Sequence, residues 1–181
     1  MHSPEINYII FFRIFHRFPY NADMAESELI KIVCISDNHG TMDPVKEIPS
    51  MFPDADYFLH CGDSREPARR YGPYAQVRGN NDFYDVPEYR VLEIGEHRIF
   101  LTHGTRLVYI GSYEYLAAAA KQRDCDIALF GHTHIYCDVE KDGVRCLNPG
   151  SIWHNRDGSK PSFMIIELEG KEIRAYRRTF P

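Results

Sequence analysis

Short apolar runs separated by turn-forming residues dominate the pattern along this chain of 181 residues. The run 29–35 is apolar and rich in β-branched residues, interrupted only at Lys31, and the runs 57–60 and 127–130 are similar. Such runs are typical of strands that are buried on both faces. Further strands are expected at 74–77, 89–94, 97–102, 135–140, 144–147, 162–168 and 171–177.

Turn residues join several neighbouring strands directly. Gly95-Glu96, Lys141-Asp142-Gly143 and Glu169-Gly170 each separate two strand-like runs. Short turns of this composition between two such runs predict hairpins. Hairpins should therefore dominate the second half of the chain.

Three segments carry helical patterns. The segment 41–51 has Pro44 in its first turn, 112–123 is rich in alanine, and 65–71 is a weaker candidate. Strands therefore alternate with helices early in the chain and give way to hairpins later. This order predicts an α/β sandwich in which two mixed sheets lie face to face with helices outside.

Residues 1–28 differ from the rest of the chain. Their apolar run 8–12 is far shorter than the ~20 residues that cross a bilayer, and Glu5 stands where a signal peptide carries basic residues. We therefore expect no membrane association, and interpret 1–28 as an extension that is flexible or not native. The segment 8–18 could instead form an apolar helix that packs on the domain or on a second copy in a homo-oligomer. Residues 29–181 are expected to form a single domain.

Composition places the chain among ordinary globular proteins, with 44% hydrophobic and 26% charged residues. A formal net charge of -5 argues against a nucleic-acid partner that needs a basic surface. It leaves a small anionic substrate open, because bound dications would make a cleft locally positive. The five cysteines form no C-x-x-C pair, which favours a reduced, cytoplasmic protein.

Residues that can bind metals recur in five short segments, nearly all beside glycine. The segments are Ser36-Asp37-Asn38-His39-Gly40, Cys61-Gly62-Asp63, Arg78-Gly79-Asn80-Asn81-Asp82, Thr102-His103-Gly104 and Gly131-His132-Thr133-His134. Carboxylate, imidazole and amide oxygen together suit Mn, Fe, Zn, Co or Ni. A calcium or magnesium site would hold more oxygen, and a structural zinc site would hold cysteine.

The positions of these residues favour one shared site. Asp37 and His39 are two residues apart, as are His132 and His134, so each pair can point to the same side of an extended chain. Asp63 and His103 each follow an apolar run, so each should lie where a buried strand ends and its loop begins. Each residue alone is better interpreted as a cap, a turn or a core residue. The ordered set of seven favours two divalent ions.

The ordered segments resemble the motifs of the calcineurin-like metallophosphoesterases, and most closely those of the small, single-domain YfcE-type branch. The D-x-H-G, G-D, G-N-x-D and histidine blocks occur in order, followed by Asn148-Pro149-Gly150-Ser151. The resemblance extends from about Ile30 to the C-terminus. It implies a four-layer αββα sandwich and the hydrolysis of phosphoesters.

The resemblance also implies how two divalent ions are held. One ion would be bound by Asp37, His39, Asp63 and His134, and the other by Asp63, Asn80, His103 and His132. Asp63 would bridge the ions, and a metal-bridging hydroxide would attack phosphorus in line with the leaving oxygen. Manganese is favoured, with Ni, Zn, Fe, Co and Mg as alternatives.

One position departs from many members of the family. They carry a histidine in the G-N-x-D block, which is thought to protonate the leaving group, whereas this chain has Asn81. An amide is no general acid at neutral pH, and general acids typically contribute ~10²–10⁴-fold, so poor leaving groups should react slowly. Asn81 can still bind a phosphate oxygen. Arg65 is a second candidate substrate contact.

The leading interpretation is therefore a dinuclear metal-dependent phosphoesterase, with Asp63, Asn80 and Asn81 as the residues expected to act in catalysis. A phosphodiesterase that acts on small phosphoesters is favoured. A phosphomonoesterase or nucleotidase is the alternative, and a non-catalytic interaction scaffold of the same fold is a third hypothesis.

Overall fold

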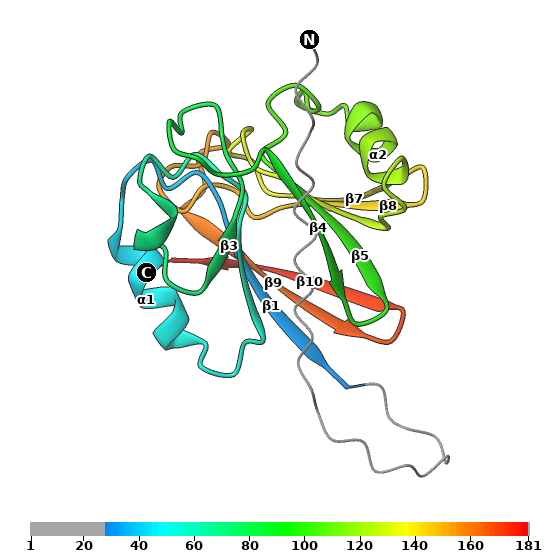
Figure 1. Ribbon diagram of the computed structural model, residues 1–181, viewed down its shortest axis with the longest axis horizontal. Coiled ribbons are helices and arrows are strands. Elements are labelled where there is room, and N and C mark those ends of the chain that lie inside the picture. The colour runs from blue at the N-terminus through cyan, green and yellow to red at the C-terminus, as the bar shows by residue number, and fades with distance from the viewer. Residues whose placement is uncertain (1–27, 181) are drawn as a thin grey trace.

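Two five-stranded mixed sheets pack face to face in a computed structural model of the chain (Figure 1). The structure describes residues 28–180, so the expectations for residues 1–27 lie outside the described part. In the first sheet the strand order is β10 (Glu172–Thr179), β9 (Ser162–Glu169), β1 (Ile30–Ile35), β2 (Tyr57–His60) and β3 (Tyr74–Gln76). In the second sheet it is β4 (Tyr89–Ile94), β5 (His97–Thr102), β6 (Ile127–Leu129), β8 (Val144–Asn148) and β7 (Cys137–Lys141).

Strand β1 is central to the first sheet and buried on both faces. It pairs in parallel with β2 and antiparallel with β9. Ile32 and Cys34 pack between the two sheets, whereas Val33 and Ile35 pack toward the outer helix. Because successive side chains alternate between these two apolar environments, the run is apolar throughout rather than alternating.

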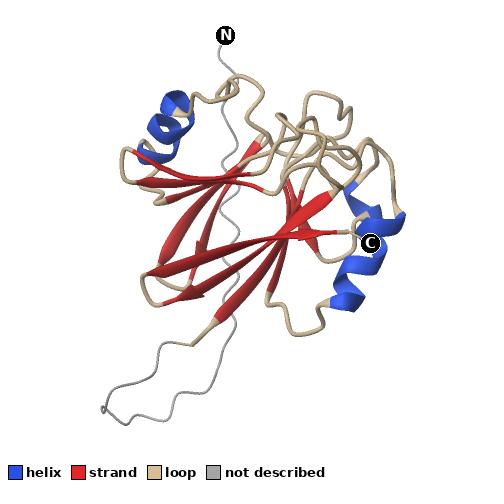
Figure 2. Ribbon diagram, turned by 180° about the vertical axis from the view of Figure 1, so that it is seen from behind, coloured by secondary structure: helices blue, strands red, loops and turns tan. Residues whose placement is uncertain are grey.

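A helix covers the outer face of each sheet (Figure 2). Helix α1 (Asp43–Met51) packs Val45 and Ile48 against the first sheet, and α2 (Glu114–Lys121) packs its apolar side against the second. The predicted four-layer arrangement of two mixed sheets and outer helices is therefore confirmed. Within residues 28–180, no helix is both long enough and apolar enough to cross a membrane.

The predicted helix at 65–71 is wrong, since only a three-residue 3₁₀ turn, η1 (Ala68–Arg70), forms there. Arg65 adopts a positive φ of 61° and its backbone N–H donates to Asp82, 17 residues later. This long-range bond takes the place of a helical one, and Pro67 begins the turn afresh. Such competition from a distant acceptor leaves no trace in the local pattern.

The carboxyl ends of the parallel strands meet at one end of the sandwich. β1, β2 and β3 are mutually parallel in the first sheet, and so are β5, β6 and β8 in the second. The loops that leave these strands crowd together at this end, visible at the top of Figures 1 and 2. Every segment that carries a predicted metal ligand lies in one of these loops.

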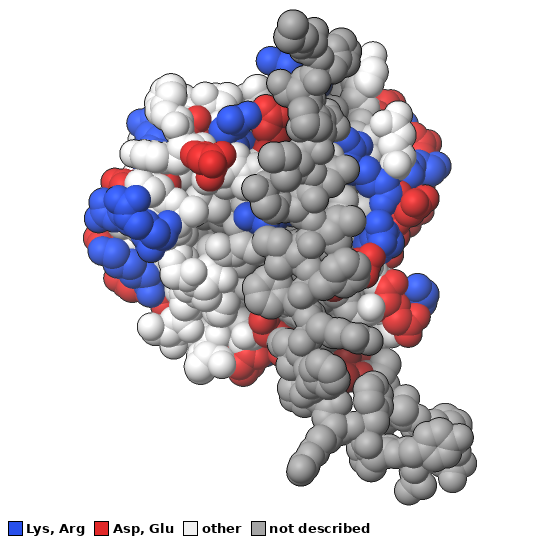
Figure 3. Space-filling model, viewed as in Figure 1, with Lys and Arg blue, Asp and Glu red and all other residues white. Residues whose placement is uncertain are grey.

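Charged side chains of both signs are interspersed over the face shown in Figure 3. One group of basic side chains lies at the left of this view, over the region of η1.

Candidate metal centre

Asp37, the first predicted ligand, is fully buried at the end of β1. Its Oδ2 accepts bonds from Ser36 Oγ at 2.6 Å and from the backbone N of His132 at 3.1 Å. Its Oδ1 accepts no hydrogen bond from the described residues, although His134 Nε2 lies 3.2 Å away. A buried carboxylate oxygen without a donor is well suited to a cation.

Two groups of side chains converge closely enough to hold ions. Asp37, His39 and His134 form one group, and Asp37, Asp63 and His103 form the other; within each, the ligand atoms lie within 4.8 Å of one another. The Nε2 atoms of His39 and His134 are 3.1 Å apart. The structure thus brings together five residues that the sequence motifs single out.

The backbone of these loops is unusually strained. Eight non-glycine residues have a positive φ in the described part of the chain, and five of them are predicted ligands. These are Asp37 (53°), His39 (46°), Asp63 (58°), His132 (66°) and His134 (57°). Such conformations cost on the order of 1 kcal/mol or more each and cluster at functional sites.

Two glycines permit this close packing. A Cβ at Gly79 would lie 2.1 Å from Oδ1 of Asp63, and a Cβ at Gly131 would lie 2.7 Å from Oδ2 of Asp37. Any side chain at either position would displace an acidic residue of the site. Gly79 and Gly131 are therefore required by sterics.

Backbone carbonyls fix the orientation of two imidazoles. His103 Nδ1 lies 2.7 Å from the carbonyl oxygen of Cys61, and His134 Nδ1 lies 2.9 Å from that of His154. Because a carbonyl can only accept, Nδ1 must carry the proton in both rings. The unprotonated Nε2 of each ring then faces the carboxylates, which is the tautomer that a metal requires.

Asp63 lies between the histidines of the two groups. Its Oδ2 is 3.7 Å from His39 Nε2 and 3.6 Å from His103 Nε2. Asn80 Oδ1 is 3.2 Å from His103 Nε2, and Asn81 donates both its backbone N and its side-chain amide to Asp63. Asp63 is therefore the carboxylate best placed to be shared by two ions.

The remaining predicted residues lie at the edge of this cluster. The His132 ring contacts that of His103, with centroids 5.3 Å apart, but His132 belongs to neither compact group of ligand atoms. Burial lowers the pKa of the His39 imidazole, and the charge of the exposed Arg65 adds to this effect. The position of His132 is compatible with a second ion, and that of Arg65 with a bound anion.

The charge balance of the site calls for cations. Burial lowers the pKa of His39 and of His132, which favours the neutral imidazoles. Burial alone would raise the pKa of Asp37, but His134, His103 and Ser36 together outweigh it and lower that pKa. Within residues 28–180, neither Asp37 nor Asp63 pairs with a lysine or arginine. Two buried carboxylates without a basic partner, beside imidazoles that include His39 and His132, therefore fit divalent ions.

Sequence reasoning missed Asp82, a buried residue that organises the loop around Asp63. Its carboxylate accepts bonds from the backbone N of Asp63 (2.9 Å), Gly79 (2.8 Å) and Arg65 (2.6 Å), and from Ser64 Oγ (3.0 Å). Four donors share one carboxylate, so Asp82 is committed to structure rather than to a metal. Its fixed place at the end of the G-N-x-D block was the available signal.

Arg156 was also missed. Its backbone N donates to the carbonyl of His134 at 3.0 Å, and its positive charge lowers the pKa of His132 and partly offsets the rise at His134. An exposed cation beside two predicted ligands is a natural contact for an anionic substrate. No short-range motif points to it.

Two residues beside the site have structural roles. His60 is fully buried, accepts the N–H of Gly62 on Nδ1 and faces Asn38 Oδ1 with Nε2, and burial lowers its pKa to about 4. Cys61 is buried 3.5 Å from Cys34, and burial raises the pKa of its thiol. Both residues are therefore packed side chains of the core.

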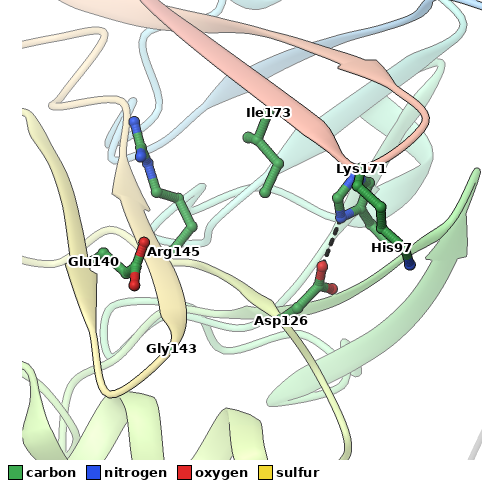
Figure 4. Close-up of a pocket in the computed structure, with 7 residues that line it drawn as sticks. All are labelled: His97, Asp126, Glu140, Gly143, Arg145, Lys171 and Ile173. Atoms are coloured by element: carbon green, nitrogen blue, oxygen red, sulfur yellow. Dashed lines mark hydrogen bonds and ion pairs between the residues drawn. The ribbon is translucent and has the colours of Figure 1, made fainter.

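A hollow of about 320 Å³ lies at the opposite ends of the second sheet's strands (Figure 4). It is lined by His97, Asp126, Glu140, Gly143, Arg145, Lys171 and Ile173. Its basic side chains each have a carboxylate partner: His97–Asp126, Arg145–Asp138 and Lys171–Glu96. Because these charges are already compensated and the hollow lies away from the strained loops, it is not the candidate site.

Comparison with known proteins gives a consistent family. The calcineurin-like phosphoesterase superfamily domain matches residues 30–171. The probable metallophosphoesterase YsnB of Bacillus subtilis is 33% identical over 146 residues, which cover 77% of this chain and 85% of YsnB. The chain therefore belongs to the calcineurin-like phosphoesterase superfamily, as its motifs predict.

Solved structures share the fold. A predicted phosphoesterase from Streptococcus pneumoniae has a TM-score of 0.78 and 28% identity, covering 87% of this chain and 91% of its own. Vacuolar Protein Sorting 29 from Cryptosporidium parvum has a TM-score of 0.68 and 27% identity, covering 84% of this chain and 92% of its own. The family implies divalent metal ions, which agrees with the donor set described above.

Proposed function

We propose that this protein is a dinuclear metal-dependent phosphoesterase that prefers phosphodiesters. The observation that carries the proposal is the convergence of two buried carboxylates and of unprotonated imidazole nitrogens. Most of these side chains belong to loop residues with a left-handed backbone conformation. One ion would be held by Asp37, His39, Asp63 and His134, and the other by Asp63, Asn80, His103 and His132. Asp63 is assigned to both because its Oδ2 lies between His39 and His103.

The chain's own residues prepare the site for an anionic ester. Bound divalent ions would polarise the phosphoryl oxygens and activate a water molecule for in-line attack. Asn81 holds Asp63 in place through two hydrogen bonds, and Arg65 and Arg156 add positive charge at the rim. Water-excluding burial of the carboxylates strengthens every electrostatic interaction within the site.

Asn81 is the reason to prefer diesters with good leaving groups. It cannot donate a proton to a departing alkoxide at neutral pH, so the reaction depends on a leaving oxygen that is stable as an anion. A phosphomonoesterase is the second candidate. Arg65 and Arg156 favour it, because a monoester dianion carries one more negative charge than a diester.

A purely scaffolding role is less well supported. Vacuolar Protein Sorting 29 shares the fold, so the fold alone does not decide between catalysis and interaction. This chain nevertheless fills all seven predicted ligand positions with competent residues, and five of them adopt strained backbone conformations. Backbone strain at so many ligand positions supports the proposal of a catalytic site.

Hydrolysis of bis(p-nitrophenyl) phosphate and p-nitrophenyl phosphate tests the proposal directly. The protein would be stripped of metal and reconstituted separately with Mn, Ni, Zn, Co, Fe or Mg. Metal-restored cleavage that favours the diester is expected, whereas preference for the monoester would support the phosphatase. Asp63→Asn should abolish restored activity, and full activity in this variant would contradict the two-metal mechanism.

A further inference from the structure

We propose that Trp153 is a stacking platform for a planar aromatic group on one ester of the substrate. This makes phosphodiesters that carry a nucleobase or an aryl group the class that the site takes. The inference rests on the proposed function, and concerns the loop between β8 and β9. None of the predicted ligands lies in this loop.

Trp153 lies beside the candidate metal centre. Its ring centroid is 5.2 Å from that of His39, with an angle of 59° between the planes. The residue is nevertheless 50% exposed, and it belongs to none of the hydrophobic clusters of the described core. The indole packs on the imidazole of the predicted metal ligand His39 and remains half exposed. It is therefore placed to stack on a flat substituent of a bound ester.

The loop fixes this indole relative to Asp37. Ser151 Oγ donates to the carbonyl oxygen of Asp37 at 2.8 Å, and it accepts the backbone N–H groups of Trp153 and His154 at 3.1 and 2.8 Å. Ser151 is fully buried. The same hydroxyl holds the backbone of Trp153 and that of Asp37, so this part of the loop needs little ordering when substrate binds.

Aromatic stacking would let the site distinguish between substrates without hydrogen bonds to their substituents. Every nucleobase and aryl ring has a face that can stack, and a single such contact changes affinity by about tenfold. Arg156, in the same loop, is an exposed cation whose backbone N donates to the carbonyl oxygen of His134 at 3.0 Å. The two residues together would favour an aromatic anion over an alkyl one.

The protein's single tryptophan provides a direct test, because its fluorescence reports on Trp153 alone. Protein loaded with zinc, which does not quench by paramagnetism, would be titrated with adenosine 5′-monophosphate, phenyl phosphate and ribose 5-phosphate. Quenching by the two aromatic phosphates and not by ribose 5-phosphate is expected. A stronger response to the nucleotide would identify the base as the preferred group, and an equal response would identify a simple aryl group.

The result that would overturn the platform is an equal response to ribose 5-phosphate, or no response to any aromatic phosphate. If such protein still hydrolysed diesters, the proposed function would stand and only the platform would fall. If the metal-loaded protein showed base-dependent quenching but hydrolysed no diester, the platform would stand and the proposed function would fail.

Kinetics with one leaving group provide an independent test. Thymidine 5′-(p-nitrophenyl) phosphate and methyl p-nitrophenyl phosphate release the same phenolate, but only the first carries a base. Trp153→Ala should lower about tenfold the ratio of kcat/KM for the thymidine ester to kcat/KM for the methyl ester, while Trp153→Phe should retain most of this preference. Tyr176→Ala, which removes a 37% exposed ring from β10, is the matched control. Equal losses for both esters would overturn the proposal, because the nitrophenyl ring that they share is the leaving group and only the thymidine ester carries an aromatic group on its other ester.

Discussion

Asn81 holds both oxygens of the Asp63 carboxylate. Its backbone N donates to Oδ1 at 2.8 Å and its side-chain Nδ2 donates to Oδ2 at 2.6 Å. The same Oδ2 faces the imidazoles of His39 and His103. The residue that replaces the histidine of many relatives is therefore a positioning group for the central carboxylate.

Asn81→His should restore a proton donor at this position. The variant should hydrolyse esters of poor leaving groups about tenfold faster relative to p-nitrophenyl esters, because only a poor leaving oxygen needs the proton. The ratio of rates for an alkyl and an aryl diester measures this effect. Asn81→Ala, which offers no proton, should leave the ratio unchanged while lowering both rates. An unchanged ratio in Asn81→His would mean that position 81 does not reach the leaving oxygen.

Divalent ions should stabilise the protein through His134. Binding to the folded state alone raises the melting temperature, by an amount that grows with ion concentration over Kd. In His134→Ala, about tenfold more ion should be needed for the same rise in melting temperature, measured by thermal unfolding with and without chelator. His154→Ala is the control, because only its backbone carbonyl contacts His134. Equal stabilisation of both variants would remove His134 from the proposed ligands.

Asp82→Ala should destabilise the fold by about 3 kcal/mol, since it leaves four donors around a buried position unsatisfied. Hydrolysis should fall as well, because the backbone N of Asp63 loses its acceptor. Urea unfolding of this variant can be compared with Asp85→Ala, which removes an exposed carboxylate from the same loop. We expect a change within about 0.5 kcal/mol for the control.

His60 should make the fold sensitive to acid. Burial lowers its pKa to about 4 in the folded state, whereas the unfolded value is near 6.5, so the unfolded chain binds this proton first. The contribution is complete above pH ~6.5 and is lost as the pH falls toward ~4, by about 3 kcal/mol. Urea unfolding across this range should give a shallower pH dependence for His60→Gln than for wild type. Identical slopes would contradict a neutral, buried His60.

The core of the fold could be predicted because its strands carry strong local signals. The β-branched run of β1 and the Gly95-Glu96 turn between β4 and β5 each specify their structure within a few residues. Strand order could not be predicted in the same way. β9 lies between β10 and β1, and the pairing of Lys31 with Glu167 joins residues far apart in the chain. Only the packing of two apolar faces selects that neighbour.

The candidate site was predictable as a set of residue types and less so as a network. Asp37, His39, Asp63, His103 and His134 come together because each terminates a strand or begins its loop. Ser151 lies in one of the recognised segments, but its bond to Asp37 could not be anticipated, since that bond spans 114 residues. Strain was equally hidden, because positive φ at an aspartate or histidine depends on contacts that the neighbouring residues do not encode.

The candidate centre joins the two halves of the sandwich. Asp37 and Asp63 follow strands of the first sheet, whereas His103 and His134 follow strands of the second. His39 and His134 are 95 residues apart in sequence, yet their Nε2 atoms are 3.1 Å apart. An ion held between them would cross-link the chain across that span, and so reduce the entropy of the unfolded state as a disulfide does. A chelator would then act on this protein as a reducing agent acts on a disulfide-linked one. It would remove the cross-link between the two sheets at one end of the sandwich.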